Sequence, residues 1–259
     1  MQSAGSSMKR FKIAQLKEKL RQLEKPILEG VDTGFPEIDH RLTVADGRHS
    51  SAARRPVLSR GAVHHVVPQT MCDLPAALGF AIHLTLQIAQ HHMILWTQTP
   101  KARHEWGEPY LPGLLRHGVG VDQFLYVADP SARDWLWVLE EAGACADVGC
   151  VLGLCAQKEL SFTATRRLSL CVQKAITTMV LVSPAQHQAL ATATQWEVSA
   201  AADEHWRVLL KRRAGAALPP PHPWLLKPAY APAAYEWASS TSHASTSQQE
   251  VHAPRQFIQ

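Results

Sequence analysis

Residues 66–84, VVPQTMCDLPAALGFAIHL, decide the fold, because they read as a strand that runs through a short loop into a helix. Asp73 and Pro75 mark the start of that helix, as an N-cap followed by a proline in the first turn. In many proteins a loop of this shape holds the phosphates of a nucleotide. Here the loop has no glycine before Gly79 and no lysine. The stretch predicts a strand-to-helix connection whose loop needs a separate explanation.

The loop PQTMCD lacks the groups that bind phosphate. A phosphate loop of the form GxxxxGK[ST] uses glycines to expose backbone N–H groups, a lysine to neutralise charge and a hydroxyl to hold magnesium. Pro68 removes one N–H donor, and Asp73 places a negative charge where a phosphate would sit. Thr70 is a hydroxyl without a lysine beside it. We therefore expect no nucleotide hydrolysis at this loop.

Strands and helices alternate around this stretch. Short apolar runs predict strands at 61–67, 92–98, 123–128, 147–154 and 177–183, and longer periodic segments predict helices at 73–90, 109–119, 131–144 and 163–175. The alternation predicts an α/β fold with a mainly parallel sheet and helices on its faces. Two consecutive strands, 193–201 and 204–215, predict an antiparallel pair at the C-terminal edge of the sheet.

The first 30 residues predict a basic amphipathic helix outside the core domain. Its narrow apolar stripe includes Phe11, Leu16, Leu20 and Leu23, and Pro26 ends it. The stripe could pack on its own domain or contact a partner, and we treat its residues as candidate partner-binding residues. Residues 43–59 are polar and predict a loop.

The C-terminal residues 217–259 predict a flexible tail, because they are rich in proline and then in serine. Two tryptophans, Trp224 and Trp237, are unusual in such a segment. Either residues 224–226 pack back on the domain, or the tail carries a docking motif in which Trp224 and Trp237 bind a partner. The core domain then spans residues 31–216.

Composition points to a protein with its own core in a reducing compartment. Apolar residues make up 46% and charged residues 19% of the 259 residues. The sequence contains no run of 18 apolar residues, so we expect no membrane span. Five cysteines without a C-x-x-C pair favour free thiols, and the three in CADVGCVLGLC are expected to be small buried residues in a strand rather than metal ligands. We expect a cytoplasmic protein without a cofactor, a metal site or catalytic residues.

The net charge is only +4, but basic residues are concentrated in the N-terminal segment MKRFKIAQLKEKLRQLEK and in the stretch HWRVLLKRR near residue 210. They are either solvated faces or contacts to DNA phosphates, in which case binding would depend steeply on salt. Trp206 could stack on a base, but its place on an alternating strand favours the core. The candidate DNA-binding residues are Lys9, Arg10, Arg207, Lys211, Arg212 and Arg213.

The order of these segments over residues 31–216 resembles the RecA ATPase core. The similar stretches are DTGFPEIDHRL, LSRGAVHHVV, GVGVDQFLYV and ALATATQWEVSAADEHWRVLLKRRAG. Two further acidic residues that the resemblance implies are missing. Gln98 stands where an acidic base would end the strand after the first helix, and Leu152 and Gly153 stand where a magnesium-binding aspartate would end a later strand.

Among RecA relatives without a phosphate loop, the chain is most similar to the ImuA family, through the basic N-terminal segment and the order of TGFPEIDHRL, RGAVHHVV, ILWTQT, TATRRLSLCVQKA and HWRVLLKRRAG. The resemblance implies a non-enzymatic role in SOS-induced translesion DNA synthesis. The implied partners are the polymerase-like protein ImuB, an error-prone polymerase and RecA, and it leaves room for contact with DNA and for self-association. Two alternatives remain: a SulA-type inhibitor of the division protein FtsZ, and a degenerate RecA-type ATPase.

Overall fold

A computed structural model describes residues 30–45, 57–128, 130–156, 160–184, 190–215, 218 and 221–228. The expectations for the N-terminal helix, with Phe11, Leu16, Leu20, Leu23, Lys9 and Arg10, lie outside these residues, as does Trp237. The helices are α2 (Pro36–Ala45), α3 (Leu74–Ala89), α4 (Pro100–Trp106), α5 (Leu111–Arg116), α6 (Ala132–Ala144) and α7 (Phe162–Ala175), with 3-10 turns η2 (Met71–Asp73) and η3 (Val121–Gln123).

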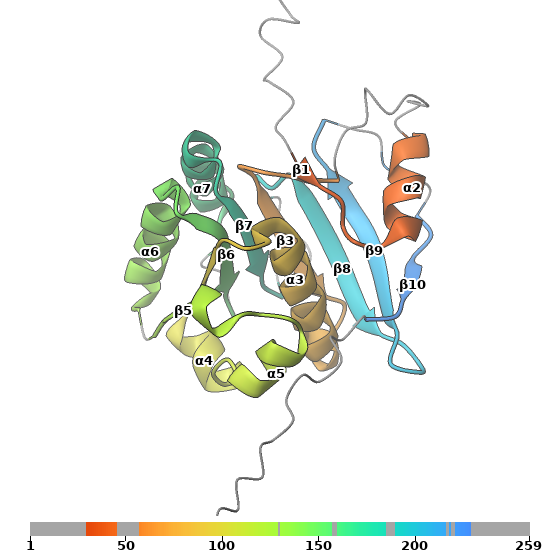
Figure 1. The fold of residues 1–259 in the computed structure, drawn as a ribbon, viewed down its shortest axis with the longest axis horizontal. Helices are drawn as coiled ribbons and strands as arrows, with labels where there is room; N and C mark the ends of the chain where they lie inside the picture. Colours follow the sequence, from red (N-terminus) through yellow and green to blue (C-terminus); the bar gives the residue numbers. More distant parts are fainter. Residues whose placement is uncertain are drawn as a thin grey trace, which may run out of the picture.

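The strands form two sheets. β1 (Gly30–Val31) and β2 (Leu58–Ser59) make a small antiparallel pair. The main sheet has eight strands in the order β10-β9-β8-β3-β7-β6-β4-β5 (Figure 1). Its strands are β3 (Val63–Pro68), β4 (Met93–Gln98), β5 (Phe124–Val127), β6 (Val148–Leu154), β7 (Thr178–Val182), β8 (Thr194–Ala200), β9 (Trp206–Arg213) and β10 (Trp224–Leu226).

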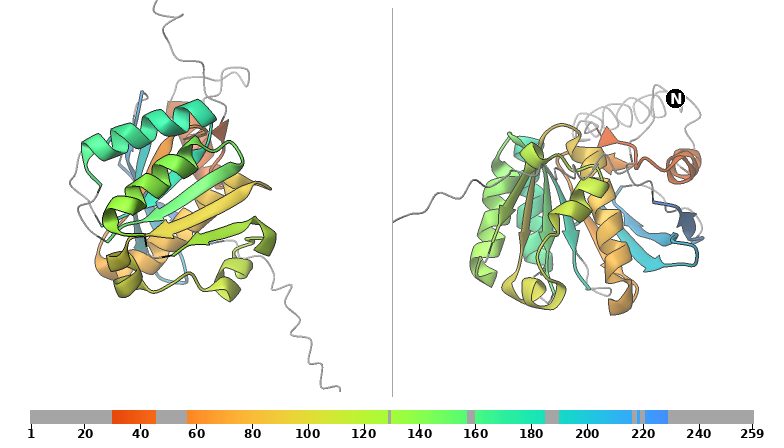
Figure 2. Two further views of the ribbon diagram at one scale, coloured as in Figure 1. Left: turned by 90° about the vertical axis from the view of Figure 1, so that its left-hand side faces the viewer. Right: turned by 60° about the horizontal axis from the view of Figure 1, so that its bottom comes forward.

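The pairing confirms a mostly parallel α/β sheet. β8, β3, β7, β6, β4 and β5 are parallel to their neighbours, and β8, β9 and β10 are joined by antiparallel pairs. β3 and β4 are consecutive in the chain but separated in the sheet by β7 and β6. Because the connections run over the faces, helices cover both: α3 packs on β3, β6, β7 and β8, and the α6–α7 pair packs on the opposite face (Figure 2).

α3 is the central helix, and its sequence explains its place. Ten of its sixteen residues are buried, because apolar residues surround most of the helix rather than forming one stripe. By length and composition alone the segment Met71–Ala89 could cross a membrane, but half of it is buried inside the domain. Gly79 allows close approach to β9, since a Cβ there would lie 2.8 Å from Cζ2 of Trp206. The segment is a core helix.

Helix α6 begins as the sequence predicts. The Ser131 hydroxyl accepts a hydrogen bond from the backbone N–H of Asp134, which is an N-cap. Trp135 is fully buried and Trp137 is exposed, because two residues along a helix turn a side chain to a different face. This segment was therefore predictable from local pattern alone.

The tail boundary predicted at residue 217 is wrong for part of the tail. Residues 224–226 form β10, which pairs with β9, so β9 is not the edge strand. The Trp224 indole is buried, its Nε1–H donates to the carbonyl oxygen of Glu37 at 3.2 Å, and the Arg41 guanidinium lies 4.9 Å from its ring centroid. Trp224 therefore packs back on the domain, and a partner could reach it only by displacing β10.

Two further elements were not predicted. α4 follows β4 directly, with Thr99 as N-cap and Pro100 at the first position, although these signals are visible in the sequence. Leu58 and Ser59, expected in a loop, pair with residues 30 and 31. β1 and β2 have two residues each, which is too short for a sequence pattern to identify a strand.

The turn between β8 and β9 is strained. Asp203 and Glu204 both have positive φ, 57° and 59°, a conformation that suits glycine or asparagine. We predict that Glu204→Gly raises the free energy of unfolding by about 0.5–1 kcal/mol, because glycine removes the Cβ clash. Urea denaturation measures the change. As a control, Glu141→Gly, at an exposed position within α6, should lower the free energy of unfolding by about 1 kcal/mol. If both substitutions changed the free energy of unfolding in the same direction, the explanation from positive φ would be contradicted.

Candidate functional site

In a parallel α/β sheet, ligands bind beyond the carboxyl ends of the strands, where loops lead into helices. The loop from β3 to α3 lies at this edge, next to the end of β8. β4 ends at Gln98 and β6 at Leu154 on the same edge. These positions are therefore the candidate site, and the question is which groups they present.

Three backbone donors of the β3–α3 loop are already used within the protein. The Gln69 N–H donates to the Val198 carbonyl oxygen at 2.8 Å, and the Asp73 N–H donates to the Thr70 carbonyl oxygen at 3.0 Å. The Thr70 N–H donates to Oδ2 of Asp73 at 3.0 Å. No residue from Pro68 to Asp73 has a positive φ, so the loop forms a 3-10 turn instead of wrapping N–H groups around an anion.

The Asp73 carboxylate holds this loop closed. Its Oδ2 also accepts the Thr70 hydroxyl at 2.6 Å, and its Oδ1 accepts the Ala200 N–H of β8 at 2.9 Å. Desolvation opposes ionisation of this carboxyl, but the hydrogen bonds from Thr70 and Ala200 outweigh it and lower the pKa of Asp73. Asp73 precedes α3 as predicted, yet its side chain does not cap that helix; it joins the loop to the neighbouring strand.

Gln98 is a structural bridge at the end of β4. Its Oε1 accepts from Nε1–H of Trp96 at 3.1 Å, and its Nε2 donates to the Gly107 carbonyl oxygen at 2.9 Å. The residue is buried, so both ends of its amide are satisfied within the protein. A carboxylate would face the Gly107 oxygen with no proton to share, and the amide fits here for that reason.

The interior at Gly153 excludes a larger side chain. A Cβ there would lie 2.8 Å from Cδ2 of Leu181, 3.1 Å from Cδ2 of Leu139 and 3.4 Å from Cζ2 of Trp135. Aromatic and aliphatic groups therefore fill the volume that an aspartate at this position would need. Leu152, its neighbour, is also buried in the core. The end of β6 presents no oxygen ligand for magnesium.

One serine and one histidine lie in hydrogen-bonding geometry. Nε2 of His65 is 2.8 Å from Oγ of Ser183, which is the separation of a nucleophile and its base. Both side chains are fully buried, however, and burial lowers the pKa of His65 to about 3. Nδ1 of His65 has no hydrogen-bond partner, so no carboxylate orients the ring. No substrate can reach this pair, and it serves the core.

His64 points to the opposite face of β3 and is equally enclosed. Its Nδ1 lies 2.8 Å from Oγ1 of Thr194, and its Nε2 lies 3.1 Å from the Ser59 carbonyl oxygen. Nε1–H of Trp196 donates to the same Thr194 oxygen at 2.7 Å. Burial lowers the pKa of His64 to about 4, although the Ser59 contact opposes this shift. Two neutral histidines thus occupy the central strand.

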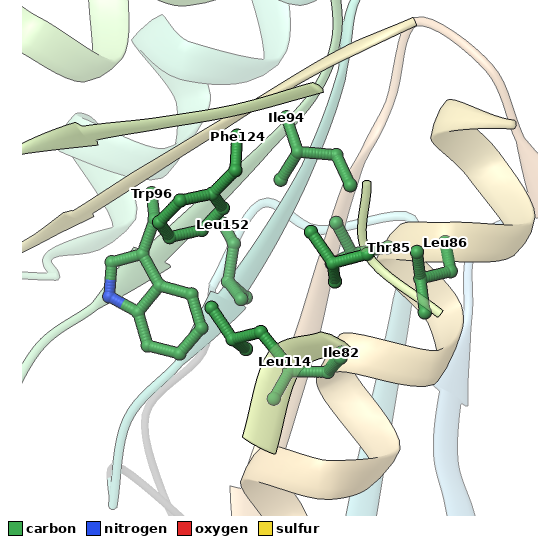
Figure 3. Close-up of a pocket in the computed structure, with 9 residues that line it drawn as sticks. Ile82, Thr85, Leu86, Ile94, Trp96, Leu114, Phe124 and Leu152 are labelled. Carbon is green, nitrogen blue, oxygen red and sulfur yellow. The ribbon is translucent and has the colours of Figure 1, made fainter. Parts of the chain in front are cut away.

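An apolar gap lies between α3, α5 and the sheet (Figure 3). It has an empty volume of about 210 Å³, below the usual size of a ligand pocket, and Thr85 is its one polar lining residue. Trp96, Leu114 and Phe124 point into it from three elements. The Thr85 hydroxyl already donates to the Ala81 carbonyl oxygen at 2.8 Å, so this small apolar gap does not fit a nucleotide.

The predicted basic cluster of β9 is not one surface. Arg207 is exposed, and Lys211 forms an ion pair with Glu197 at 3.4 Å. Arg212 donates to the Leu190 carbonyl oxygen, and Arg213 is buried. A register shift between Gln195 and Trp196 explains this, because a bulge reverses the alternation of faces along the strand pair. Grouping the four as one DNA contact was therefore wrong.

Trp206 is buried against Phe80, with ring centroids 6.0 Å apart, and so cannot stack on a base beside Arg207. The cysteines of the CADVGCVLGLC segment are free thiols that pack in the protein interior or at its boundary. Cys150 and Cys155 are buried, and burial raises the pKa of Cys150 to about 12, while Cys145 is half-buried. Within the described parts of the chain, no three histidine, cysteine or acidic side chains lie together as a metal site would require.

No family model matches this chain. No curated protein has a significant match to it. The assignment of function therefore depends on the residues and the geometry.

The closure of the loop by Asp73 can be measured. We predict that Asp73→Asn lowers the free energy of unfolding by about 1–2 kcal/mol at neutral pH, because the amide cannot accept all three hydrogen bonds. The pKa of Asp73 is lowered, so its contribution is present above pH ~4 and is lost as the pH falls through the folded-state pKa. Urea denaturation at neutral and acid pH tests both points. Asp122→Asn, at an exposed aspartate, is the control and should have little effect.

The buried histidines predict a loss of stability in mild acid. Their folded-state pKa values, about 4 and about 3, lie below the unfolded value of 6.5, so the unfolded chain binds more protons between these values. The free energy of unfolding should fall by roughly 4 kcal/mol between pH 7 and pH 5. His65→Gln should remove about half of this pH dependence, whereas His104→Gln, at an exposed position, should leave it unchanged. An unchanged slope in His65→Gln would contradict the assignment.

Proposed function

We propose that this chain is a RecA-like, non-catalytic accessory protein of SOS-induced translesion DNA synthesis, similar to the ImuA family. The observation that carries the proposal is the β3–α3 loop, in which the N–H groups of Gln69 and Thr70 donate to oxygens of the protein and Asp73 ties the loop to β8. A connection with the shape of a nucleotide site is retained, but its chemistry is replaced by internal hydrogen bonds. Such a domain is suited to present surfaces to other proteins.

The opening turn supports the RecA-like relation. The N–H and hydroxyl of Thr33 both donate to Oδ1 of Asp39, at 2.9 and 3.0 Å, and Gly34 takes a positive φ of 81°. Nε2 of His83 lies 2.8 Å from the Thr33 carbonyl oxygen, which fixes the turn on α3. The turn, β3, α3 and the late antiparallel pair β8–β9 follow in the order that suggested the resemblance.

The partners of the proposed function are ImuB-like protein, an error-prone polymerase and RecA, in the cytoplasm. Candidate contacts remain the N-terminal stripe and Trp237. Among the basic residues, Arg207 and Lys211 keep exposed side chains that could reach DNA.

Nucleotide binding is the first test. We expect isothermal titration with magnesium and ATP to show no binding at the ~10 μM level, which would be worth about 7 kcal/mol. Magnesium-dependent binding at that strength, lost in a Thr70→Ala variant, would favour the degenerate ATPase instead.

Partner binding is the second test, and it uses the full chain. A Leu16→Glu/Leu20→Glu variant or a Trp237→Ala variant should reduce capture of purified ImuB-like protein at least tenfold, with an unchanged circular dichroism spectrum. Trp137→Ala, at an exposed tryptophan of α6, is the matched control. If capture fails for the unmodified chain while it binds FtsZ and causes filamentation, the division-inhibitor alternative is correct.

A further inference from the structure

β10 lies on the edge of the sheet in the way that a bound peptide would. Residues 224–226 pair antiparallel with β9, and Figure 1 shows β10 beside that strand. Their side chains alternate, since Trp224 is 5% exposed, Leu225 61% and Leu226 2%. Added strands are recognised in this way, because main-chain hydrogen bonds hold the backbone and pockets take every second side chain.

Helix α2 supplies the polar groups that hold this segment. Nε1–H of Trp224 donates to the Glu37 carbonyl oxygen at 3.2 Å. The guanidinium of Arg41, one turn later on α2, lies 4.9 Å from the centroid of the Trp224 ring. Nη1 of the same arginine donates to the His222 carbonyl oxygen at 3.1 Å. One arginine therefore contacts both the tryptophan and the backbone that leads into it.

β10 covers a small part of the outer side of β9. It pairs with Trp206, Arg207 and Val208, the first three of the eight residues of β9. The positions that would continue this pairing toward Arg213 are residues 219–223, PPPHP. Proline has no N–H to donate to a neighbouring strand, so this sequence cannot extend β10. A segment without these prolines would pair with more of β9.

We infer that the α2–β9 groove, defined by Glu37, Arg41 and residues 206–213, binds an extended segment of a partner protein that carries a tryptophan and, two residues later, an aliphatic side chain. Residues 224–226 occupy this groove in cis as a competing ligand. A ligand on a short tether, here residues 214–223, has an effective concentration in roughly the millimolar range. A partner therefore displaces β10 only if its segment pairs more extensively with β9.

Fluorescence anisotropy with a labelled peptide of residues 219–228, PPPHPWLLKP, tests the groove on the full chain. Trp224→Ala, whose own segment has lost its anchor, should bind the peptide at least tenfold more tightly than the unmodified chain. Adding Arg41→Ala should weaken binding at least fivefold, whereas adding Arg133→Ala, at an exposed arginine of α6, is the matched control. Circular dichroism melting checks that each variant folds. Equal binding to the unmodified chain and to Trp224→Ala would overturn the inference.

Changes in the peptide test how the segment is recognised. Trp224→Ala or Leu226→Ala in the peptide should lower its affinity at least tenfold, and Leu225→Ala should not, because that side chain points to solvent. Pro221→Thr with Pro223→Thr should raise the affinity at least threefold, since the peptide can then pair with more of β9. Peptides that all bind alike would indicate nonspecific apolar binding, and a threonine peptide without any gain would leave a partner no advantage over β10; either result would overturn the inference.

A disulfide between β9 and β10 gives a test that keeps Trp224 in the chain. Leu225 lies directly opposite Arg207 and both are exposed, so Arg207→Cys with Leu225→Cys places two thiols face to face. Oxidation should weaken peptide binding at least tenfold and reduction should restore it, whereas Leu225→Cys alone should show no such change. Binding that oxidation leaves unaffected contradicts the inference. Disulfide-linked dimers on a non-reducing gel would show that a second copy supplies the strand, and would overturn it as well.

Discussion

The hydrogen bonds accepted by one carboxylate, Asp73, organise the centre of this protein. Three donors, two from Thr70 and one from Ala200, bind its two oxygens. They close the loop after β3, fix the start of α3 and join both to β8. α3 in turn covers β3, β6, β7 and β8. The loop that begins this helix therefore helps to fix β8 against the other three strands. The Asp73 carboxylate, whose negative charge would repel a phosphate, is thus the group to which the loop is hydrogen-bonded.

The sequence was sufficient where structure is decided locally. The order of strands and helices from β3 to β9, apart from α4, was predictable, because buried strands and capped helices have short-range signals such as Ser131. The expectation that this loop lacks phosphate-binding groups also follows from residue types, without any distant contact. The actual contacts of Asp73 could not, because Ala200 is 127 residues away along the chain.

Sequence reasoning left two alternatives open, or was wrong, where distant pairing decides the outcome. Trp224 lies in a proline-rich segment, and only its docking against Glu37 and Arg41 makes residues 224–226 a strand. Arg213 was grouped with Arg207 because both are basic and close in sequence, but the irregular register between β8 and β9 turns Arg213 into the interior.

The packing at Gly153 limits which side chains the end of β6 can hold. The side chains of Leu181, Leu139 and Trp135 close over the position where an acid would be needed. A Cβ at Gly153 would force the end of the Leu181 side chain to move and would press on Leu139, and replacing these leucines by smaller residues would leave a void in the core under α6. A single Gly153→Asp substitution would therefore cost stability before it could supply an oxygen ligand at this strand end.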